Sequence, residues 1–240
     1  MKLSVLIPVY NEENTVENLI KKVAQIKGQG SITELEIIAV NDCSVDNTLK
    51  ILRNIESSGL IKLVHHELNM GKGAAIRTAI AHATGEFTIF QDADLEYDPA
   101  DIVKMAGVVE EKGIDILYGS RFLEKKESPL GKFHYFVNAG LTTLSNFFTG
   151  LKLTDMETCY KMFRTQVIKK IEIEENRFGL EPEITAKAAA LVASEKLKME
   201  EIPISYIPRK HSDGKKIGFR DGLRAVYIIF KYGFKTENML

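Results

Sequence analysis

The stretch that decides the fold lies at residues 87–96 and reads FTIFQDADLE. A short, largely apolar run opens it, and Asp92 and Asp94 follow almost at once. Such a run is typical of a strand buried in a sheet. In extended chain the side chains at positions i and i+2 lie on the same side. The two carboxylates should therefore emerge together where the strand ends.

This pair of carboxylates predicts a site for a divalent cation, Mg²⁺ or Mn²⁺. Ligands of open α/β sheets bind at the carboxyl ends of the strands. Two carboxylates there repel each other unless a cation lies between or beside them, and a hard cation keeps positions for phosphate oxygens. The alternative is a solvated turn that caps the next helix, but Asp98, just before Pro99, already supplies that cap.

Strand and helix signals alternate on either side of this stretch through the first half of the chain. Five such alternations predict an α/β fold with a mostly parallel sheet and helices on both faces. Ser44 is the predicted N-cap of the second helix. The expected strands are 3–9, 35–40, 61–64, 87–90 and 114–118, and the expected helices cover 16–26, 44–55, 73–83 and the segment after 98.

The alternation ends after Arg121. We expect one domain over residues 1–240, in which 1–122 form a nucleotide-binding half and 123–240 an acceptor-side half. The second half should contain a charged loop at 124–132, an amphipathic helix, a strand near 157–163, a helix over 182–192, a strand near 199–207, a basic loop at 209–218 and a closing helix.

Composition excludes several classes of protein. The 240 residues are 45% hydrophobic and 27% charged, which excludes disorder, collagen and a disulfide scaffold. The net charge of −1 argues against a nucleic-acid binder. Two cysteines and no leader predict a cytoplasmic protein. No stretch predicts a transmembrane helix, and the P-loop, dinucleotide-binding, zinc and G-x-S-x-G patterns are missing.

Polar residues also follow the other predicted strands. Asp42 ends the second strand, and the sequence PVYNEE over 8–13 ends the first. The sequence NMGKG over 69–73 precedes a helix, and its glycines would let a ligand approach the backbone closely. Turn chemistry explains each feature alone, but it does not explain why they gather at one rim of the sheet.

At these residues the chain resembles the family 2 glycosyltransferases of the GT-A fold, and within them the dolichol-phosphate mannosyltransferase-like and polyprenyl-phosphate glycosyltransferase branch. The resemblance covers nearly the whole chain. Asn41 and Cys43 depart from it, since they replace the first Asp and the Gly of D-D-G-S, and Glu96 stands where mannosyltransferases tend to have Gln. The motifs that carry it are PVYNEE (8–13), NDCSVDNT (41–48), NMGKG (69–73), DADL (92–95) and GSR (119–121).

The resemblance implies a nucleotide-sugar donor and a divalent cation. It places metal and diphosphate binding at Asp92, Asp94 and Glu96, with Arg121 near the phosphates. We expect catalysis at Asp94, Arg121 and Asp155, the last because it begins the segment after the expected acceptor helix. The residues expected to bind the nucleotide sugar are Pro8, Tyr10, Glu12, Asn41, Asp42, Lys72, Asp92, Ala93, Asp94 and Arg121.

We expect single-displacement transfer with inversion. A polyprenyl phosphate acceptor is already anionic and needs little general-base help, whereas a saccharide hydroxyl needs a base, for which Asp155 is the candidate. Residues 206–240 carry eight cations and three anions, which favours an acceptor phosphate near Arg209 and Lys215 and peripheral contact with the cytoplasmic face of a membrane. The open alternatives are a saccharide acceptor, a sugar nucleotidyltransferase and a non-catalytic nucleotide-sugar binder, and a homo-oligomer is also left open.

Overall fold

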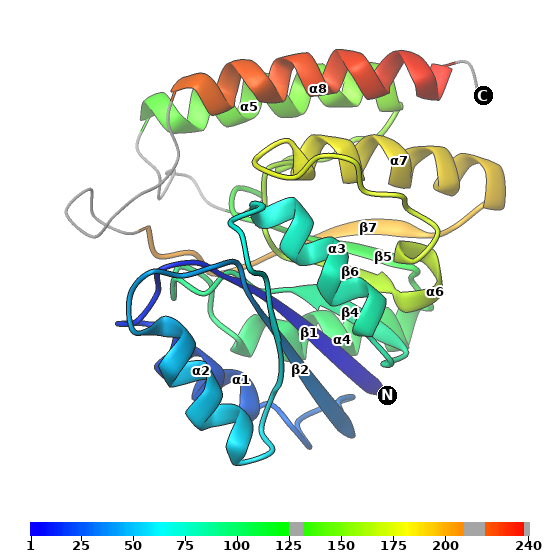
Figure 1. The fold of residues 1–240 in the computed structure, drawn as a ribbon. Coiled ribbons are helices and arrows are strands. Elements are labelled where there is room, and N and C mark those ends of the chain that lie inside the picture. The colour runs from blue at the N-terminus through cyan, green and yellow to red at the C-terminus, as the bar shows by residue number, and fades with distance from the viewer. Residues whose placement is uncertain (125–131, 209–218, 238–240) are drawn as a thin grey trace.

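The computed structural model describes residues 1–124, 132–208 and 219–237 (Figure 1). The predicted acceptor-phosphate residues Arg209 and Lys215 lie outside these ranges. A seven-stranded sheet has the order β3-β2-β1-β4-β6-β5-β7. Its strands are β1 (Lys2–Val9), β2 (Glu34–Asn41), β3 (Lys62–His65), β4 (Phe87–Phe90), β5 (Ile116–Ser120), β6 (Lys161–Arg164) and β7 (Met199–Pro203).

The sheet is mostly parallel, as predicted. Strand β6 pairs antiparallel with both β4 and β5, and every other pairing is parallel. Six strands therefore end at the same edge of the sheet, and β6 begins there. The segment that leads into β6 therefore lies at the same edge as the loops that follow β1, β2, β4, β5 and β7. We call this edge of the sheet the carboxyl edge.

The helices complete a mixed α/β fold, which confirms the predicted fold class. Helix α3 packs on β1 and β2, and α4 contacts β5. The largest apolar cluster is built around strands β1, β2, β4 and β5. The helices are α1 (Val16–Ala24), α2 (Thr48–Ser57), α3 (Lys72–His82), α4 (Ala100–Lys112), α5 (Lys132–Thr149), α6 (Thr165–Ile168), α7 (Leu180–Glu195) and α8 (Phe219–Glu237).

Helices α5, α7 and α8 form a separate layer. Each of the three contacts the other two, and Figure 1 shows α5 and α8 side by side over α7, on the far side from β1 and β2. Leu141 and Phe148 of α5 pack with Ala225 and Ile229 of α8 in a second apolar cluster. Within the described ranges, no helix is both long enough and apolar enough to cross a membrane.

The predicted cap of α2 is wrong. The helix begins at Thr48, whose N–H donates to Asp46 Oδ1 at 3.0 Å. The Ser44 hydroxyl instead accepts from the Asn11 N–H at 3.0 Å. A tertiary contact thus takes the side chain that would suit a cap. The strand expected near 157–163 begins only at Lys161, because the preceding residues cross the carboxyl edge.

The glycines at the start of α3, Gly71 and Gly73, also have a different explanation from the one predicted. A Cβ on Gly71 would overlap the Asn176 carbonyl oxygen, and one on Gly73 would overlap that of Glu175. The Gly73 N–H donates to Asn176 O at 2.8 Å, and Arg77 donates to Asn176 Oδ1 at 2.9 Å. The close approach is therefore made by the loop before α7, and no ligand is needed to explain these glycines.

We expect Gly73→Ala to lower the free energy of unfolding by about 2–3 kcal/mol, because backbone atoms must move to admit the methyl group. Urea denaturation measures the change. Gly107→Ala is the matched control, since no heavy atom lies within 4 Å of a Cβ there. It should add about 0.5–1 kcal/mol by helix propensity. A Gly73→Ala protein as stable as wild type would contradict this packing.

Candidate active site

The carboxyl edge gathers most of the predicted site residues. Pro8 and Asn41 lie in β1 and β2, and Arg121 directly follows β5. Helices α3 and α7 begin at the same edge and bring Lys72 and Glu181. Because the strands share one direction, residues far apart in sequence become neighbours here.

The loops after β1 and β2 are bound tightly to each other. Asn11 Oδ1 accepts from the Val45 N–H at 2.9 Å, and the Glu12 N–H donates to Thr48 Oγ1 at 2.8 Å. Glu12 Oε2 accepts from Thr15 at 2.7 Å. These bonds hold Asn11 and Glu12 in place. The predicted contacts of Tyr10 and Glu12 with the nucleotide sugar stay predictions.

The Asp42 carboxylate is buried and hydrogen-bonded to other residues of the chain. Its side chain is 3% exposed, and Oδ1 accepts from His66 Nδ1 at 2.8 Å. The Met70 N–H donates to Oδ1 at 2.9 Å and the Gly71 N–H to Oδ2 at 2.6 Å. Asp42 therefore anchors the loop before α3. Its predicted contact with the base or ribose stays a prediction, and it would have to share a carboxylate that already has three partners.

Asn41, by contrast, has a side-chain oxygen that accepts no hydrogen bond from the described residues. Its Nδ2 lies 2.9 Å from His65 Nδ1, to which it donates if that nitrogen is the unprotonated one. Its Oδ1 is buried and has no hydrogen-bond partner in the part of the chain described. A buried polar atom is nearly always satisfied, so this oxygen lacks a donor that such an atom usually has.

A lysine bridges two carboxylates at the centre of the edge. Lys72 Nζ lies 2.9 Å from Asp92 Oδ1 and 2.9 Å from Glu181 Oε1. Burial lowers the pKa of Lys72, but the two carboxylates outweigh it and hold this pKa well above its usual value. Glu181 was missed by the sequence reasoning, because nothing in the sequence near α7 shows that it faces Lys72.

The three predicted metal ligands do not assemble. Glu96 Oε2 accepts from the Tyr206 hydroxyl at 2.6 Å, which draws it away from a shared site. Within residues 1–124, 132–208 and 219–237, no three His, Cys, Asp or Glu side chains lie close enough to hold a metal. Asp92 and Asp94 supply the one or two carboxylates that Mg²⁺ often takes beside phosphate oxygens, and the two oxygens of Asp92 lie 2.9 and 3.1 Å from Lys72 Nζ.

Asp155 does not suit the role of a base. It is 0% exposed and holds Arg121 through two parallel bonds, from Nε to Oδ2 and from Nη2 to Oδ1, both 2.7 Å long. The Arg121 N–H adds a third bond of 3.0 Å. A carboxylate that is buried and engaged in this way has no free oxygen to offer to a substrate hydroxyl. Its role is to position Arg121, and this corrects the prediction of Asp155 as proton acceptor.

Tyr206, which the sequence reasoning did not select, joins the two halves of the site. Its ring lies under the Arg121 guanidinium at 5.2 Å, and its hydroxyl donates to Glu96. Tyr97 packs against it at 5.1 Å, and the Tyr97 hydroxyl accepts from the Cys159 N–H at 3.1 Å. The aromatic pair therefore links the loop after β4 to Arg121.

Glu157 is the third residue that the sequence reasoning missed. Its Oε1 is buried and has no hydrogen-bond partner among the described residues. Burial, and then Glu181, raise the pKa of Glu157 to about 7. The folded state therefore keeps a proton that the unfolded chain releases, so this group should reduce stability as the pH rises from about 4.5 to 7.

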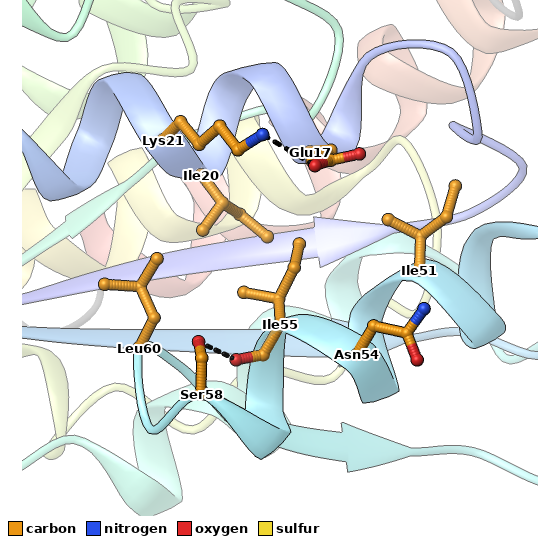
Figure 2. A pocket seen from close by; sticks show the side chains of 8 residues that line it. All are labelled: Glu17, Ile20, Lys21, Ile51, Asn54, Ile55, Ser58 and Leu60. Atoms are coloured by element: carbon orange, nitrogen blue, oxygen red, sulfur yellow. Dashed lines mark hydrogen bonds and ion pairs between the residues drawn. The ribbon is translucent and has the colours of Figure 1, made fainter.

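A surface pocket lies elsewhere and contains none of these groups. It is formed between α1 and α2, where Ile20, Ile51, Ile55 and Leu60 line it (Figure 2). The exposed Glu17–Lys21 ion pair lies at the same pocket. Its lining offers a ligand few polar groups that a neighbour does not already hold, so the candidate site remains the carboxyl edge.

We expect Asp155→Asn to lower the free energy of unfolding by about 3–5 kcal/mol, because it leaves the buried Arg121 uncompensated. Urea denaturation at pH 7 measures this. The control is Asp115→Asn, since Asp115 pairs with Arg164 and both side chains are partly exposed, at 22% and 34%. That variant should lose about 1 kcal/mol. Equal losses would contradict the structural role of Asp155.

Comparison with known proteins gives the family. The model of glycosyl transferase family 2 matches residues 4–172. Dodecaprenyl-phosphate galacturonate synthase of Rhizobium johnstonii is 31% identical over 219 residues, which are 90% of this chain and 62% of that protein. Dolichol-phosphate mannosyltransferase of Pyrococcus furiosus is 25% identical over 245 residues, covering 100% of this chain and 67% of its own length. The chain thus spans less than two thirds of the first relative.

Solved structures share the fold. Glucosyl-3-phosphoglycerate synthase of Mycobacterium tuberculosis, with Mn²⁺, UDP and glucosyl-3-phosphoglycerate, matches with a TM-score of 0.70 and 14% identity over 97% of this chain and 80% of its own. S. aureus TarS with UDP-GlcNAc matches with a TM-score of 0.64 and 22% identity over 100% of this chain and 70% of its own. With the family match, these results confirm the predicted resemblance: the chain belongs to glycosyl transferase family 2 and is a glycosyltransferase of the GT-A fold.

Proposed function

We propose that this glycosyltransferase moves a sugar, with inversion, from a nucleotide sugar to a polyprenyl phosphate. The observation that carries the proposal is the carboxyl edge itself, where Asp92, Lys72 and Arg121 stand at strand ends and a helix start. The names of the relatives support the acceptor, since one acts on dodecaprenyl phosphate and another on dolichol phosphate.

The donor would lie across the ends of β1, β2 and β4. Asn41 would receive an N–H of the base on its unpartnered Oδ1. Pro8, Tyr10 and Glu12 would border the nucleoside, while Asp42 keeps the loop before α3 in place. Residues 1–122 would thus form the donor half, and 123–240 the acceptor half.

The diphosphate would lie near Asp92, Ala93 and Asp94. A bound divalent cation would supply charge neutralisation for the leaving nucleoside diphosphate. The neighbouring structures with Mn²⁺ and UDP support this choice of cofactor. Lys72, held between Asp92 and Glu181, would stay protonated and attract the phosphates. Arg121 would act at the same developing charge, already oriented by Asp155.

The acceptor side offers a surface suited to a membrane. On α5, Phe136 is 68% exposed and Phe147 is 77% exposed. On α8, Leu223, Tyr227 and Phe230 recur at helical spacing and are 59%, 55% and 39% exposed. We call these five residues the α5–α8 surface. Aromatic residues with nearby cations favour a lipid interface, and the Arg224 guanidinium lies over Tyr227 at 5.3 Å.

We expect Asp94→Ala to abolish sugar transfer and to weaken Mn²⁺-dependent nucleotide binding while the protein stays folded. Transfer from UDP-glucose and GDP-mannose to a short polyprenyl phosphate measures the first, and calorimetry with UDP and GDP the second. Asp98→Ala is the control, because Asp98 Oδ1 only accepts from the Ala100 N–H at the start of α4. It should cost about 1 kcal/mol of stability and keep transfer. Undiminished turnover of Asp94→Ala with a chelator present would refute the assignment.

We also expect the protein to co-sediment with anionic vesicles at low salt and less so at high salt. The double substitution Phe147→Ser and Tyr227→Ser should weaken this binding at least tenfold, because each large side chain contributes about 1.5–3 kcal/mol when buried. Leu60→Ser, on the loop after α2, is the control with an apolar side chain that is 40% exposed and lies outside α5 and α8. No binding at low salt, with transfer only to a free saccharide, would replace the polyprenyl phosphate by a saccharide acceptor.

A further inference from the structure

The loop before α7 contacts the first turns of α3. The Gly73 N–H donates to Asn176 O at 2.8 Å. Arg77, one turn further along α3, donates to Ile173 O and to Asn176 Oδ1, both at 2.9 Å. We call residues 173–177 the 173–177 loop. It holds the part of α3 that carries the lysine at the centre of the carboxyl edge.

Helix α8 holds the same loop through charged side chains. Arg224 Nη2 donates to Glu175 Oε2 at 2.7 Å, and Lys231 Nζ donates to Glu175 Oε1 at 3.2 Å. Lys231 Nζ also lies 3.6 Å from Glu174 Oε2. Seven residues make about two helical turns, so Arg224 and Lys231 lie on one face of α8. One carboxylate of the loop therefore bridges two turns of this helix.

Glu175 is suited to such a link. Only 8% of its side chain is exposed, and its own N–H donates to Glu183 Oε2 at 2.8 Å. Burial raises the pKa of Glu175, but the hydrogen bonds from Arg224 and Lys231 outweigh it and keep this pKa below its usual value. A buried carboxylate with two charged donors fixes a loop more firmly than a solvated ion pair does.

Both ends of the Lys72 side chain are held. Its Nζ pairs with Asp92 and Glu181. The glycines on either side of Lys72 lie so close to carbonyl oxygens of the 173–177 loop that neither could carry a Cβ. Lysine has a long and flexible side chain, so the place of its charge also depends on where its backbone is fixed. The 173–177 loop fixes that backbone.

We propose that Glu175 is a positioning residue for sugar transfer, which joins α8 to the 173–177 loop and so sets the place of Lys72. The inference rests on the proposed function, in which Lys72 attracts the donor phosphates. Helix α8 also carries three residues of the α5–α8 surface, and Arg224 lies over one of them, Tyr227, at 5.3 Å. One helix thus contributes to the acceptor surface and supports the lysine of the donor site.

A double-mutant cycle tests whether Glu175 acts through Lys72. Calorimetry with UDP and GDP, in the presence of Mn²⁺, measures the affinities. We expect about tenfold weaker binding for Lys72→Gln, as for a lost hydrogen bond to a charged group. For Glu175→Ala we expect about fivefold weaker binding, at the low end of coupling between separate sites. The double variant should bind like Lys72→Gln alone, because a charge that is absent cannot be misplaced.

A second variant approaches the same link from α8. Arg224→Gln combined with Lys231→Gln removes two cations that are 52% and 31% exposed, and it should weaken nucleotide binding as Glu175→Ala does. Glu175→Gln keeps an acceptor for both cations and should recover part of the affinity. Glu195→Ala is the control. It breaks a 2.6 Å ion pair with Lys170 near the end of α7 and should bind like wild type.

Two results would overturn the inference. One is wild-type affinity in Glu175→Ala for the nucleotide that the wild-type protein binds. The other is a cycle in which the two losses multiply, because Glu175 would then act on structure alone. If Glu175→Ala does not fold, the α8 variant takes its place in the cycle. Wild-type affinity of Lys72→Gln, or a wild-type protein that binds neither nucleotide, would instead refute the proposed donor site.

Discussion

The buried pair of Arg121 and Asp155 is the interaction on which the carboxyl edge depends. Asp155 receives three hydrogen bonds from Arg121, and its own N–H donates to Glu201 Oε1 at 3.0 Å. The pair thus ties the end of β5 to the segment before β6 and to β7. Burying two charges costs more than it returns unless the geometry is nearly ideal, and here both parallel bonds are short. Such a pair is retained for the orientation it imposes, and the orientation is that of a cation at the strand ends.

Most of the other buried charges at the carboxyl edge are also paired with groups of opposite charge or with carbonyl oxygens. Lys72 compensates Asp92 and Glu181, and Arg121 compensates Asp155. Lys161 is held by carbonyl oxygens. Among the described residues, Glu157 makes no ion pair, and burial followed by the charge of Glu181 raises its pKa to about 7.

Sequence patterns predicted the elements well where local physics decides them. The strand expected at 87–90 is observed at Phe87–Phe90, since an apolar run followed by two aspartates has little other way to fold. The start of α2 was wrong because the Ser44 hydroxyl bonds to Asn11 instead. The purpose of Gly71 and Gly73 was wrong because the approaching backbone comes from residues 175–176, far along the chain.

In the candidate site, too, contacts between residues far apart in the sequence could not be predicted. Sequence identified Asp92, Lys72 and Arg121 as site residues, but a carboxylate in a sequence does not show its partner. Asp155 therefore looked like a base, although Arg121 occupies it. Glu157 and Glu181 were missed because nothing next to them in the sequence marks them. Lys72 pairs with Glu181, and Glu181 in turn raises the pKa of Glu157, and these contacts form only in the folded chain.

Backbone strain at the strand ends ties these observations together. The described residues other than glycine with positive φ are Asn11, Cys43, Leu95 and Lys196, and the first three follow β1, β2 and β4. Such conformations cost of order 1 kcal/mol each and persist where the surroundings enforce them. Cys43, at φ 58°, stands where the D-D-G-S motif of the family resemblance places glycine, the residue that adopts this backbone shape most easily. The bonds of Asn11 to Ser44 and Val45 hold the same edge. The three loops are therefore held in one conformation at some cost in stability, and a ligand that binds them needs to order them less.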